Sequence, residues 1–296
     1  MPERTSLCPL CSSEILKNLP FEYLYLSKRF PAVKCRRCGV AFLSRKPKEA
    51  ELEIMYGKSY FDGDFRCGHS GEYFGSEIHM RAGNLDTLGK IEASLGKKGK
   101  IIEIGCAGGY FLKTAMGEGW EVFGVEPSPE ASRFACEELG LPVHKGTLSS
   151  AGLPDESFDA AFLGDVIEHV EFPLDDLREV RRILRPGGIL AVAVPTSLDT
   201  LSRRLGMLGY SISRRKKTLF SPPYHLIEFT PRTLALFVEA AGFKVRRTIV
   251  TKMPANPRKF SGPEKVLFTL LETLNSSLTR LTGMWGDRVF LLGVRE

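Results

Sequence analysis

Four cysteines form two closely spaced pairs near the start of the 296-residue sequence. Cys8-Pro9-Leu10-Cys11 and Cys35-Arg36-Arg37-Cys38 both have the Cys-x-x-Cys spacing. Two such pairs separated by about twenty residues are typical of a structural zinc site, whereas a redox-active pair needs only one motif. We therefore expect Cys8, Cys11, Cys35 and Cys38 to hold one Zn²⁺. Because four thiolates leave no open coordination position, this ion is expected to be structural and not catalytic.

A second group of residues with chemical potential is the segment Glu103–Gly109, which reads Glu-Ile-Gly-Cys-Ala-Gly-Gly after a short apolar run. Glycines let a backbone pass close beneath a ligand, because a Cβ atom would block that approach. Glu126 ends the next apolar run, and a carboxylate there can accept hydrogen bonds from both hydroxyls of a ribose. The pattern predicts a site for an adenosine cofactor that includes Cys106, Ala107 and Gly108 of the loop.

The spacing of the loop residues favours one cofactor class over another. A dinucleotide site typically has Gly-x-Gly-x-x-Gly, which seats a pyrophosphate on a helix N-terminus. This chain instead has Gly105-x-x-Gly108-Gly109, with the acid Glu103 two residues before the first glycine. A carboxylate suits a cationic sulfonium and ammonium ligand and would repel a pyrophosphate. The loop therefore favours S-adenosylmethionine over a nicotinamide cofactor.

These residues require a scaffold of alternating strands and helices. Short apolar runs at 101–104, 122–125, 143–144, 158–163, 189–194, 243–250 and 289–294 read as strands. Segments at 78–95, 110–117, 128–139, 174–184, 231–241 and 260–281 have helical patterns. Uninterrupted apolar strands that alternate with helices predict a parallel sheet covered on both faces. Ligands of such sheets bind at the carboxyl ends of the strands.

Several motifs in a fixed order resemble those of class I S-adenosylmethionine-dependent methyltransferases. They are Ile101–Leu112, Val125-Glu126-Pro127, Leu153–Asp159, Asp165–Val170, Leu184–Gly188 and His225–Thr230. Among these enzymes the chain resembles ubiquinone-biosynthesis O-methyltransferases and sugar C-methyltransferases, over about residues 78–296. The resemblance implies an α/β, Rossmann-like, doubly wound sheet of seven strands, mostly parallel with the last strand antiparallel. A small zinc-ribbon-like module precedes it.

The resemblance also implies roles for individual residues. Glu103 and Gly105 would face the methionine part of the cofactor, and Glu126 would hold the ribose. Pro127 and Leu148 would lie near the adenine, and Gly164 and Asp165 would contact the methionine amino group. Related enzymes often have an aspartate one residue before the position of Leu148, where this chain has Thr147. Adenine recognition is thus expected to rest on Thr147 or on the backbone.

Two histidines are the candidates for a general base on the acceptor side. Removal of a proton from the acceptor assists methyl transfer, and histidine suits this role near neutral pH. His169 follows the fourth strand, and His225 lies after the fifth. The alternative for each is a packing or backbone-bonding role.

Ser221-Pro222-Pro223-Tyr224 resembles the motif of amino-methylating enzymes, but it follows the wrong strand, so we expect a rigid turn instead. Tyr56, Tyr60 and Phe61 resemble an aromatic element placed over the active site in related enzymes, although ordinary packing would explain them equally.

Composition and charge indicate how the chain is divided into domains and where the protein is located. We divide the chain into a zinc-binding module at residues 1–48, an aromatic connector at 49–77 and a methyltransferase domain at 78–296 with a lid insertion at about 196–230. Without an apolar run long enough for a membrane span or a secretory signal, a cytoplasmic protein is expected. Residues 203–217 contain six basic and no acidic residues, which suits an acidic or phosphorylated small-molecule substrate or a solvated loop.

Two other functions are compatible with parts of the sequence. An RNA methyltransferase could use the basic zinc module as an RNA grip, but the sparse base-stacking aromatics make nucleic acid the less favoured partner. A non-catalytic scaffold would not need the intact loop and Glu126.

Overall fold

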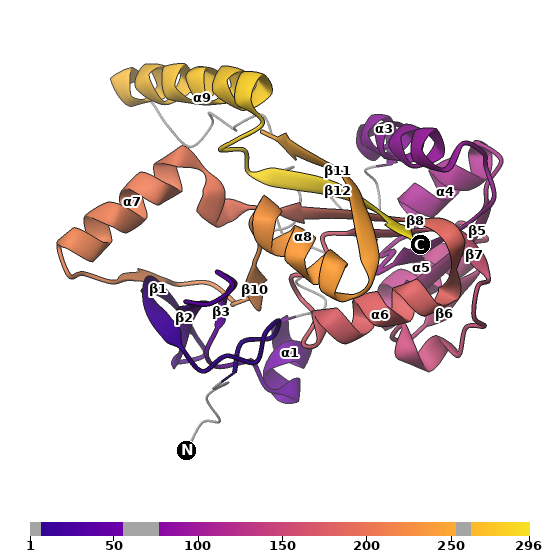
Figure 1. Ribbon diagram of the computed structural model, residues 1–296, viewed down its shortest axis with the longest axis horizontal. Helices are drawn as coiled ribbons and strands as arrows, with labels where there is room; N and C mark the ends of the chain where they lie inside the picture. The colour runs from indigo at the N-terminus through magenta and orange to yellow at the C-terminus, as the bar shows by residue number, and fades with distance from the viewer. Residues whose placement is uncertain (1–6, 56–76, 253–261) are drawn as a thin grey trace.

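The computed structural model describes residues 7–55, 77–252 and 262–296. Seven strands form the larger of two sheets, in the order β11–β12–β8–β7–β4–β5–β6 (Figure 1). They are β4 (Lys100–Ile104), β5 (Glu121–Glu126), β6 (Val143–Lys145), β7 (Phe158–Gly164), β8 (Leu184–Pro195), β11 (Phe243–Thr251) and β12 (Arg288–Arg295). The pairs among β4 to β8 are parallel, whereas β12 is antiparallel to both β8 and β11. The predicted seven-stranded sheet with an antiparallel last strand is confirmed.

Helices cover both faces of this sheet. Those packed on it include α3 (Glu77–Leu95), α4 (Tyr110–Gly117), α5 (Pro129–Glu137), α6 (Pro173–Ile183) and α8 (Pro231–Ala240). Ile91 of α3 and Leu112 of α4 share a core with Ile101, whereas Leu177 of α6 and Phe237 of α8 belong to the core that contains Ile102. Because neighbouring residues of a strand point to opposite faces, both faces of β4 are buried. This burial explains the uninterrupted apolar runs.

A second sheet contains the N-terminal module and part of the segment 196–230. Its order is β10–β3–β2–β1–β9, with β1 (Leu16–Tyr25), β2 (Lys28–Cys35), β3 (Ala41–Leu43), β9 (Lys217–Leu219) and β10 (Ile227–Glu228). β1 and β2 form a hairpin whose turn residues Leu26 and Ser27 have φ of 48° and 58°. β9 adds to β1 in parallel and β10 adds to β3 in antiparallel orientation. Residues about 200 positions apart therefore complete one sheet.

The two sheets share one hydrophobic core. Phe30 and Val33 of the N-terminal sheet belong to the same cluster of buried side chains as Leu163 of β7 and Phe237 of α8. The Leu43 amide donates to the Leu226 carbonyl at 3.0 Å, which continues the β3–β10 ladder. The module is consequently packed against the larger domain (Figure 1).

Three further helices lie outside these layers. α1 (Glu49–Met55) follows the N-terminal sheet, α7 (Leu201–Ile212) precedes β9, and α9 (Gly262–Thr282) precedes β12. In the described part of the chain no helix has the length and hydrophobicity needed to cross a bilayer. The aromatic residues Tyr56, Tyr60 and Phe61 lie outside the described residues.

Candidate active site and metal site

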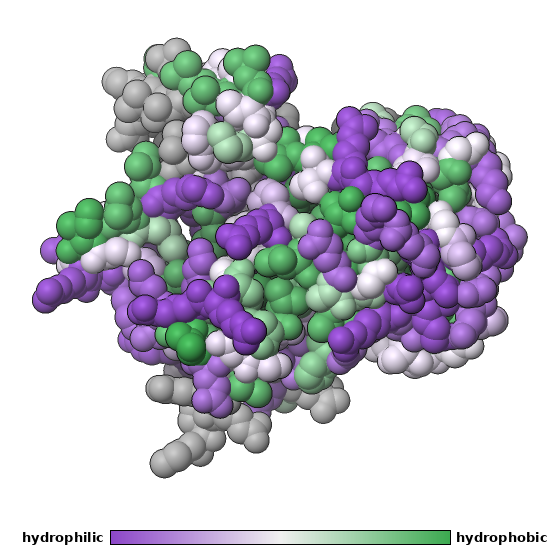
Figure 2. All heavy atoms as spheres, in the orientation of Figure 1, coloured by the Kyte–Doolittle hydropathy of each residue, from purple (hydrophilic) through white to green (hydrophobic). Residues whose placement is uncertain are grey.

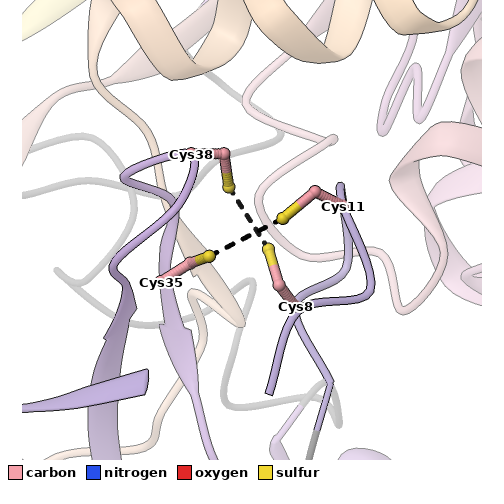
Figure 3. A group of neighbouring side chains, drawn as sticks. All are labelled: Cys8, Cys11, Cys35 and Cys38. Atoms are coloured by element: carbon pink, nitrogen blue, oxygen red, sulfur yellow. Dashed lines mark hydrogen bonds between the residues drawn. The ribbon is translucent and has the colours of Figure 1, made fainter. Parts of the chain in front are cut away.

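The four predicted metal ligands converge at one end of the N-terminal sheet (Figure 3). The Sγ atoms of Cys8 and Cys38 lie 3.4 Å apart, and those of Cys11 and Cys35 lie 3.7 Å apart. All four sulfur atoms lie within 4.8 Å of one another, and none is in a disulfide. Zinc–sulfur bonds of about 2.3 Å place the sulfurs of a tetrahedral site slightly less than 4 Å apart. The geometry of the four cysteines therefore fits a zinc ion.

Two matching backbone turns present these cysteines. The Cys8 carbonyl accepts from the Ser12 amide at 2.9 Å, and the Cys35 carbonyl accepts from the Gly39 amide at 3.0 Å. Ser12 and Gly39 both have a positive φ, of 54° and 86°. Burial raises the pKa of the Cys35 thiol, but backbone N–H groups of the turn and the neighbouring thiols of Cys38 and Cys11 together outweigh burial and bring it to about 6. These donors thus favour the thiolate of Cys35, and the thiolate is the form that binds metal.

The predicted cofactor loop connects β4 to α4 at the carboxyl end of the larger sheet. Gly105 and Gly109 have φ of 67° and 81°, and Ala107 also has a positive φ, of 47°. The amides of Gly105 and Cys106 donate to the Val125 carbonyl at 2.8 and 3.2 Å, which ties the loop to the end of β5. A Cβ atom on Gly105 would lie 2.5 Å from Cγ2 of Val166. Glycine at this position therefore permits the close approach of the segment after β7.

Glu126 is held directly in front of the loop. Its Oε2 accepts from the Ala107 amide at 2.7 Å and its Oε1 accepts from the Ser128 amide at 2.8 Å. Hydrogen bonds from backbone amides to a carboxylate are short and strong, because the acceptor is charged. These two bonds fix the carboxylate between the end of β5 and the glycine loop.

Glu103 lies on β4, two residues before the first glycine, and its side chain is buried. Its Oε2 has no hydrogen-bond partner among the described residues. Burial, with a smaller contribution from the negative charge of Glu126, raises the pKa of Glu103 well above its ordinary value. A buried carboxyl oxygen without a donor is costly. A cationic ligand group with N–H donors would supply what Glu103 lacks, so this carboxyl fits the ammonium end of S-adenosylmethionine.

The other residues predicted for the cofactor lie at the carboxyl ends of neighbouring strands. Pro127 directly follows β5 and is exposed, and Leu148 follows β6 and is buried. Gly164 ends β7, and the next residue, Asp165, has φ of 56° and forms an ion pair with Arg288 at 2.7 Å. A surface recess beside α5, lined by residues that include Arg133 and Lys145, contains none of the predicted cofactor residues.

The two predicted base candidates face each other. The rings of His169 and His225 lie 5.1 Å apart in an edge-to-face arrangement. Nδ1 of His169 is 2.8 Å from the Tyr224 carbonyl. A carbonyl can only accept, so Nδ1 bears the hydrogen and Nε2 is the nitrogen that can take up a proton. The Tyr224 carbonyl therefore orients His169.

Acidic side chains surround the histidine pair. Oε1 of Glu228 lies 3.8 Å from Nδ1 of His225, and Oε1 of Glu168 lies 3.7 Å from Nε2 of His169. Burial lowers the pKa of His225, but the carboxylate of Glu228, with smaller contributions from Glu168 and Asp165, outweighs burial and leaves the pKa above its ordinary value. Burial raises the pKa of Glu168 to about 8, and Asp165 adds to this effect.

Two members of this group were not predicted from the sequence. Tyr23 of β1 donates its hydroxyl to Oε1 of Glu228 at 3.3 Å, which links the N-terminal sheet to the histidines. Glu228 lies in the motif His225–Thr230, which gave a signal, but no pattern marked Tyr23. Burial and the charge of Glu228 raise the pKa of Tyr23, so its hydroxyl stays protonated and acts as the donor. The structure thus brings together residues from β1, β10 and the segment after β7.

The comparison with known proteins decides the family. The family model described as a methyltransferase domain matches residues 77–248, which is more than half of the chain. The chain belongs to this methyltransferase family. The seven-stranded larger sheet identifies the chain as a class I methyltransferase, and its relatives include a protein described as a probable S-adenosylmethionine-dependent methyltransferase, in agreement with the predicted resemblance.

Individual relatives of this methyltransferase differ in what they act on. This chain is 29% identical over 157 residues to a ubiquinone biosynthesis O-methyltransferase of Methylobacterium sp. (strain 4-46). The match covers 50% of this chain and 61% of that protein. The chain is 36% identical over 135 residues to a tRNA U34 carboxymethyltransferase of Hahella chejuensis, covering 39% of this chain and 42% of that protein. The matches thus span about two-fifths to three-fifths of these relatives. A solved S-adenosylmethionine-dependent methyltransferase from Thermotoga maritima shares the fold, with a TM-score of 0.51, 24% identity and coverage of 76% of this chain and 93% of that one.

Proposed function

We propose that this methyltransferase transfers a methyl group to an oxygen or carbon nucleophile of a small molecule, with His225 as the general base. The observation that carries the proposal is the pairing of His225 with Glu228, at 3.8 Å from Nδ1 to Oε1. A carboxylate on Nδ1 orients an imidazole and raises the basicity of Nε2. The same arrangement of acid and histidine activates hydroxyl groups in other enzymes.

The cofactor site follows from the residues around the glycine loop. Glu126 would accept hydrogen bonds from the ribose hydroxyls, and Glu103 would accept from the ammonium group together with the backbone at Gly164 and Asp165. Pro127 and Leu148 would border the adenine, and the backbone of Gly105–Gly108 would hold the methionine part. S-adenosylmethionine supplies an electrophilic methyl group when bound. The orphaned oxygen of Glu103 supports this assignment, because a cationic ligand is the partner it fits.

The acceptor side needs a group that takes up one proton. The bound cofactor would supply the methyl group and would keep the electron pair of the methyl–sulfur bond, so the acceptor would have one proton to lose. The acceptor proton passes to Nε2 of His225, while Glu228 stabilises the resulting imidazolium ion. His169, whose Nδ1 is bound to the Tyr224 carbonyl, serves as the second base candidate at the same site. Proton transfer of this kind contributes about 10²- to 10⁴-fold to a rate.

One basic side chain, Arg203, lies near the Tyr23 side of this site and could meet an acidic acceptor. Arg203 of α7 is close enough to Tyr23 for its charge to favour the ionised form of the tyrosine. We propose that the acceptor is an acidic or phosphorylated small molecule whose charge faces Arg203.

Zinc has a structural role in this proposal. Cys8, Cys11, Cys35 and Cys38 occupy all four positions of a tetrahedral ion, so no position remains for substrate. The ion would close the two turns that flank the β1–β2 hairpin and β3. These strands then hold β10 and its Glu228 in place.

Substitution of each histidine tests the base. We expect His225→Asn to lower kcat by about 10²-fold or more while the affinity for S-adenosylhomocysteine is unchanged in calorimetry. His144→Asn, a histidine on β6 outside the acceptor site, is the matched control and should retain activity. If His225→Asn and His169→Asn are both fully active, neither histidine is the base and the proposal is wrong.

RNA methylation is the second candidate, supported by the similarity to a tRNA-modifying enzyme. The two candidates are separated by transfer of an isotopically labelled methyl group into pools of sugars, phenols and tRNA. We expect the label in a small molecule. Label confined to tRNA, with binding that weakens steeply as salt is raised, would establish the RNA enzyme instead.

A further inference from the structure

The helix α7 carries an apolar stripe that no part of the described structure covers. Leu205, Leu208 and Ile212 are 60%, 57% and 74% exposed. Their spacing of three and four residues places them on one face of the helix. Phe220, just after β9, is 81% exposed. Surface leucines are ordinary when single, but a continuous apolar stripe indicates an interaction surface.

The opposite face of α7 is anchored to the protein. Met207, two residues from Leu205, packs partly buried against the larger hydrophobic core. Two residues correspond to about 200° of rotation around a helix, because each turn contains 3.6 residues. The anchoring of Met207 therefore directs the stripe away from the core. Figure 2 shows this stripe as a hydrophobic band along α7, with hydrophilic residues at its tip.

Basic residues follow the stripe directly. Arg214, Arg215, Lys216 and Lys217 are all exposed, and within the described ranges no acidic side chain forms an ion pair with them. Helix α9 also has exposed leucines, at Leu274, Leu278 and Leu281. It has no excess of positive charge, because Gly262–Thr282 contains two basic and two acidic residues. Apolar side chains beside a cluster of cations suit a surface of anionic lipid. The apolar side chains enter the boundary between headgroups and acyl chains, and the cations contact the phosphate groups.

We propose that α7 and the adjoining residues 214–217 dock this methyltransferase on anionic phospholipid membranes, with the helix lying in the plane of the interface. The helix of 12 residues is about 18 Å long, so it can lie on a bilayer but is too short to span one. An RNA partner explains the basic residues but leaves Leu205, Leu208 and Ile212 without a role. The membrane explains both features.

Co-sedimentation of the full chain with sucrose-loaded vesicles tests the proposal. We expect binding to phosphatidylcholine vesicles that contain phosphatidylglycerol and much weaker binding to phosphatidylcholine alone. Arg215→Gln with Lys216→Gln should weaken binding by about 25-fold, since each charge near the surface contributes about 1 kcal/mol. Leu205→Ser with Ile212→Ser should weaken it by about tenfold or more. Lys97→Gln with Lys98→Gln and Leu85→Ser with Met116→Ser are matched controls on other surfaces and should bind as the unaltered chain does.

Three results would overturn the proposal. The first is a chain that stays in solution with anionic vesicles, and the second is a stripe variant that binds them as well as the controls do. In the third, the unaltered chain is a dimer that does not bind vesicles, and the stripe variant is a monomer in light scattering. That result would show that the stripe binds a second copy of the chain. Affinity for S-adenosylhomocysteine should be the same in every variant, so failure of this proposal is distinguishable from failure of the proposed methyl transfer.

Discussion

Replacement of Glu126 by glutamine should weaken both the fold and the cofactor site by amounts that follow from its contacts. The carboxylate accepts from the amides of Ala107 and Ser128 at 2.7 and 2.8 Å. In Glu126→Gln one of these amides meets an NH₂ group, and the other retains only a neutral acceptor. A hydrogen bond to a charged group contributes about 1.5–3 kcal/mol and a neutral one about 1 kcal/mol. We therefore expect a loss of about 3 kcal/mol in unfolding free energy, or about 6–12 °C in Tm.

The same substitution should reduce the affinity for S-adenosylhomocysteine by about 30- to 150-fold, because charge-assisted bonds to the ribose hydroxyls are also lost. Isothermal titration calorimetry well below the lowered Tm measures this change separately from stability. Glu121→Gln is the matched control, because this residue lies at the other end of β5 and its ion pair with Lys100 is on the surface. Its effect should stay below about 1 kcal/mol. If Glu126→Gln lowers Tm but binds the ligand like Glu121→Gln, the assignment of Glu126 to the ribose is refuted.

Three further predictions concern the metal, the base and the buried acid. Metal analysis should find one zinc per chain, which Cys35→Ser loses and Cys136→Ser, an exposed cysteine outside the site, retains; a fully active chain without metal would contradict the zinc assignment. Tyr23→Phe should lower kcat and move the acid limb of the pH–rate profile to higher pH, because Glu228 without its donor is a stronger partner for His225; an unchanged profile would exclude a positioning role for Tyr23. Binding of S-adenosylmethionine at a pH above the ordinary pKa of a glutamate should release protons in calorimetry with buffers of different ionisation enthalpy, because the raised pKa of Glu103 falls when a cation arrives, and Glu103→Gln should remove that release. Since the folded chain keeps this proton at pH values where the unfolded chain has lost it, Glu103 makes unfolding easier as pH rises above its ordinary pKa.

The larger sheet was predictable because its strands are buried on both faces. Residues such as Ile101 and Ile102 are both fully buried, so apolar runs alone mark the strands and glycines mark their ends. Strand β12 at Arg288–Arg295 was located in the same way, and its antiparallel direction came from the family resemblance. The glycine loop could also be predicted from the sequence. Val166 approaches the backbone of Gly105 so closely that only glycine fits there.

The N-terminal sheet was harder to predict, because its pairings depend on distant residues. β9 and β10 have three and two residues, too few for a periodic pattern to stand out. The contact between Tyr23 and Glu228 joins residues 205 positions apart. Residues 203–217 were expected to bind substrate or form a solvated loop, whereas Leu201–Ile212 is a helix. The spacing of Leu205, Leu208 and Ile212 was the available signal for that helix.

The pairing of β10 with β3 explains why a structural ion would matter for acceptor chemistry. The turn that contains Cys35 and Cys38 leads directly into β3, whose residues Ala41 and Phe42 pair with Glu228 and Ile227. The amide of Leu226 in turn donates to the carbonyl of Glu168 at 2.8 Å, next to His169. The glycine loop, by contrast, is fixed by β5 in the other sheet. A chain without the ion should therefore still bind S-adenosylhomocysteine while it loses methyl transfer. Equal loss of both on metal removal would show that the two sheets fold as one unit and that the ion has no separate role at the acceptor side.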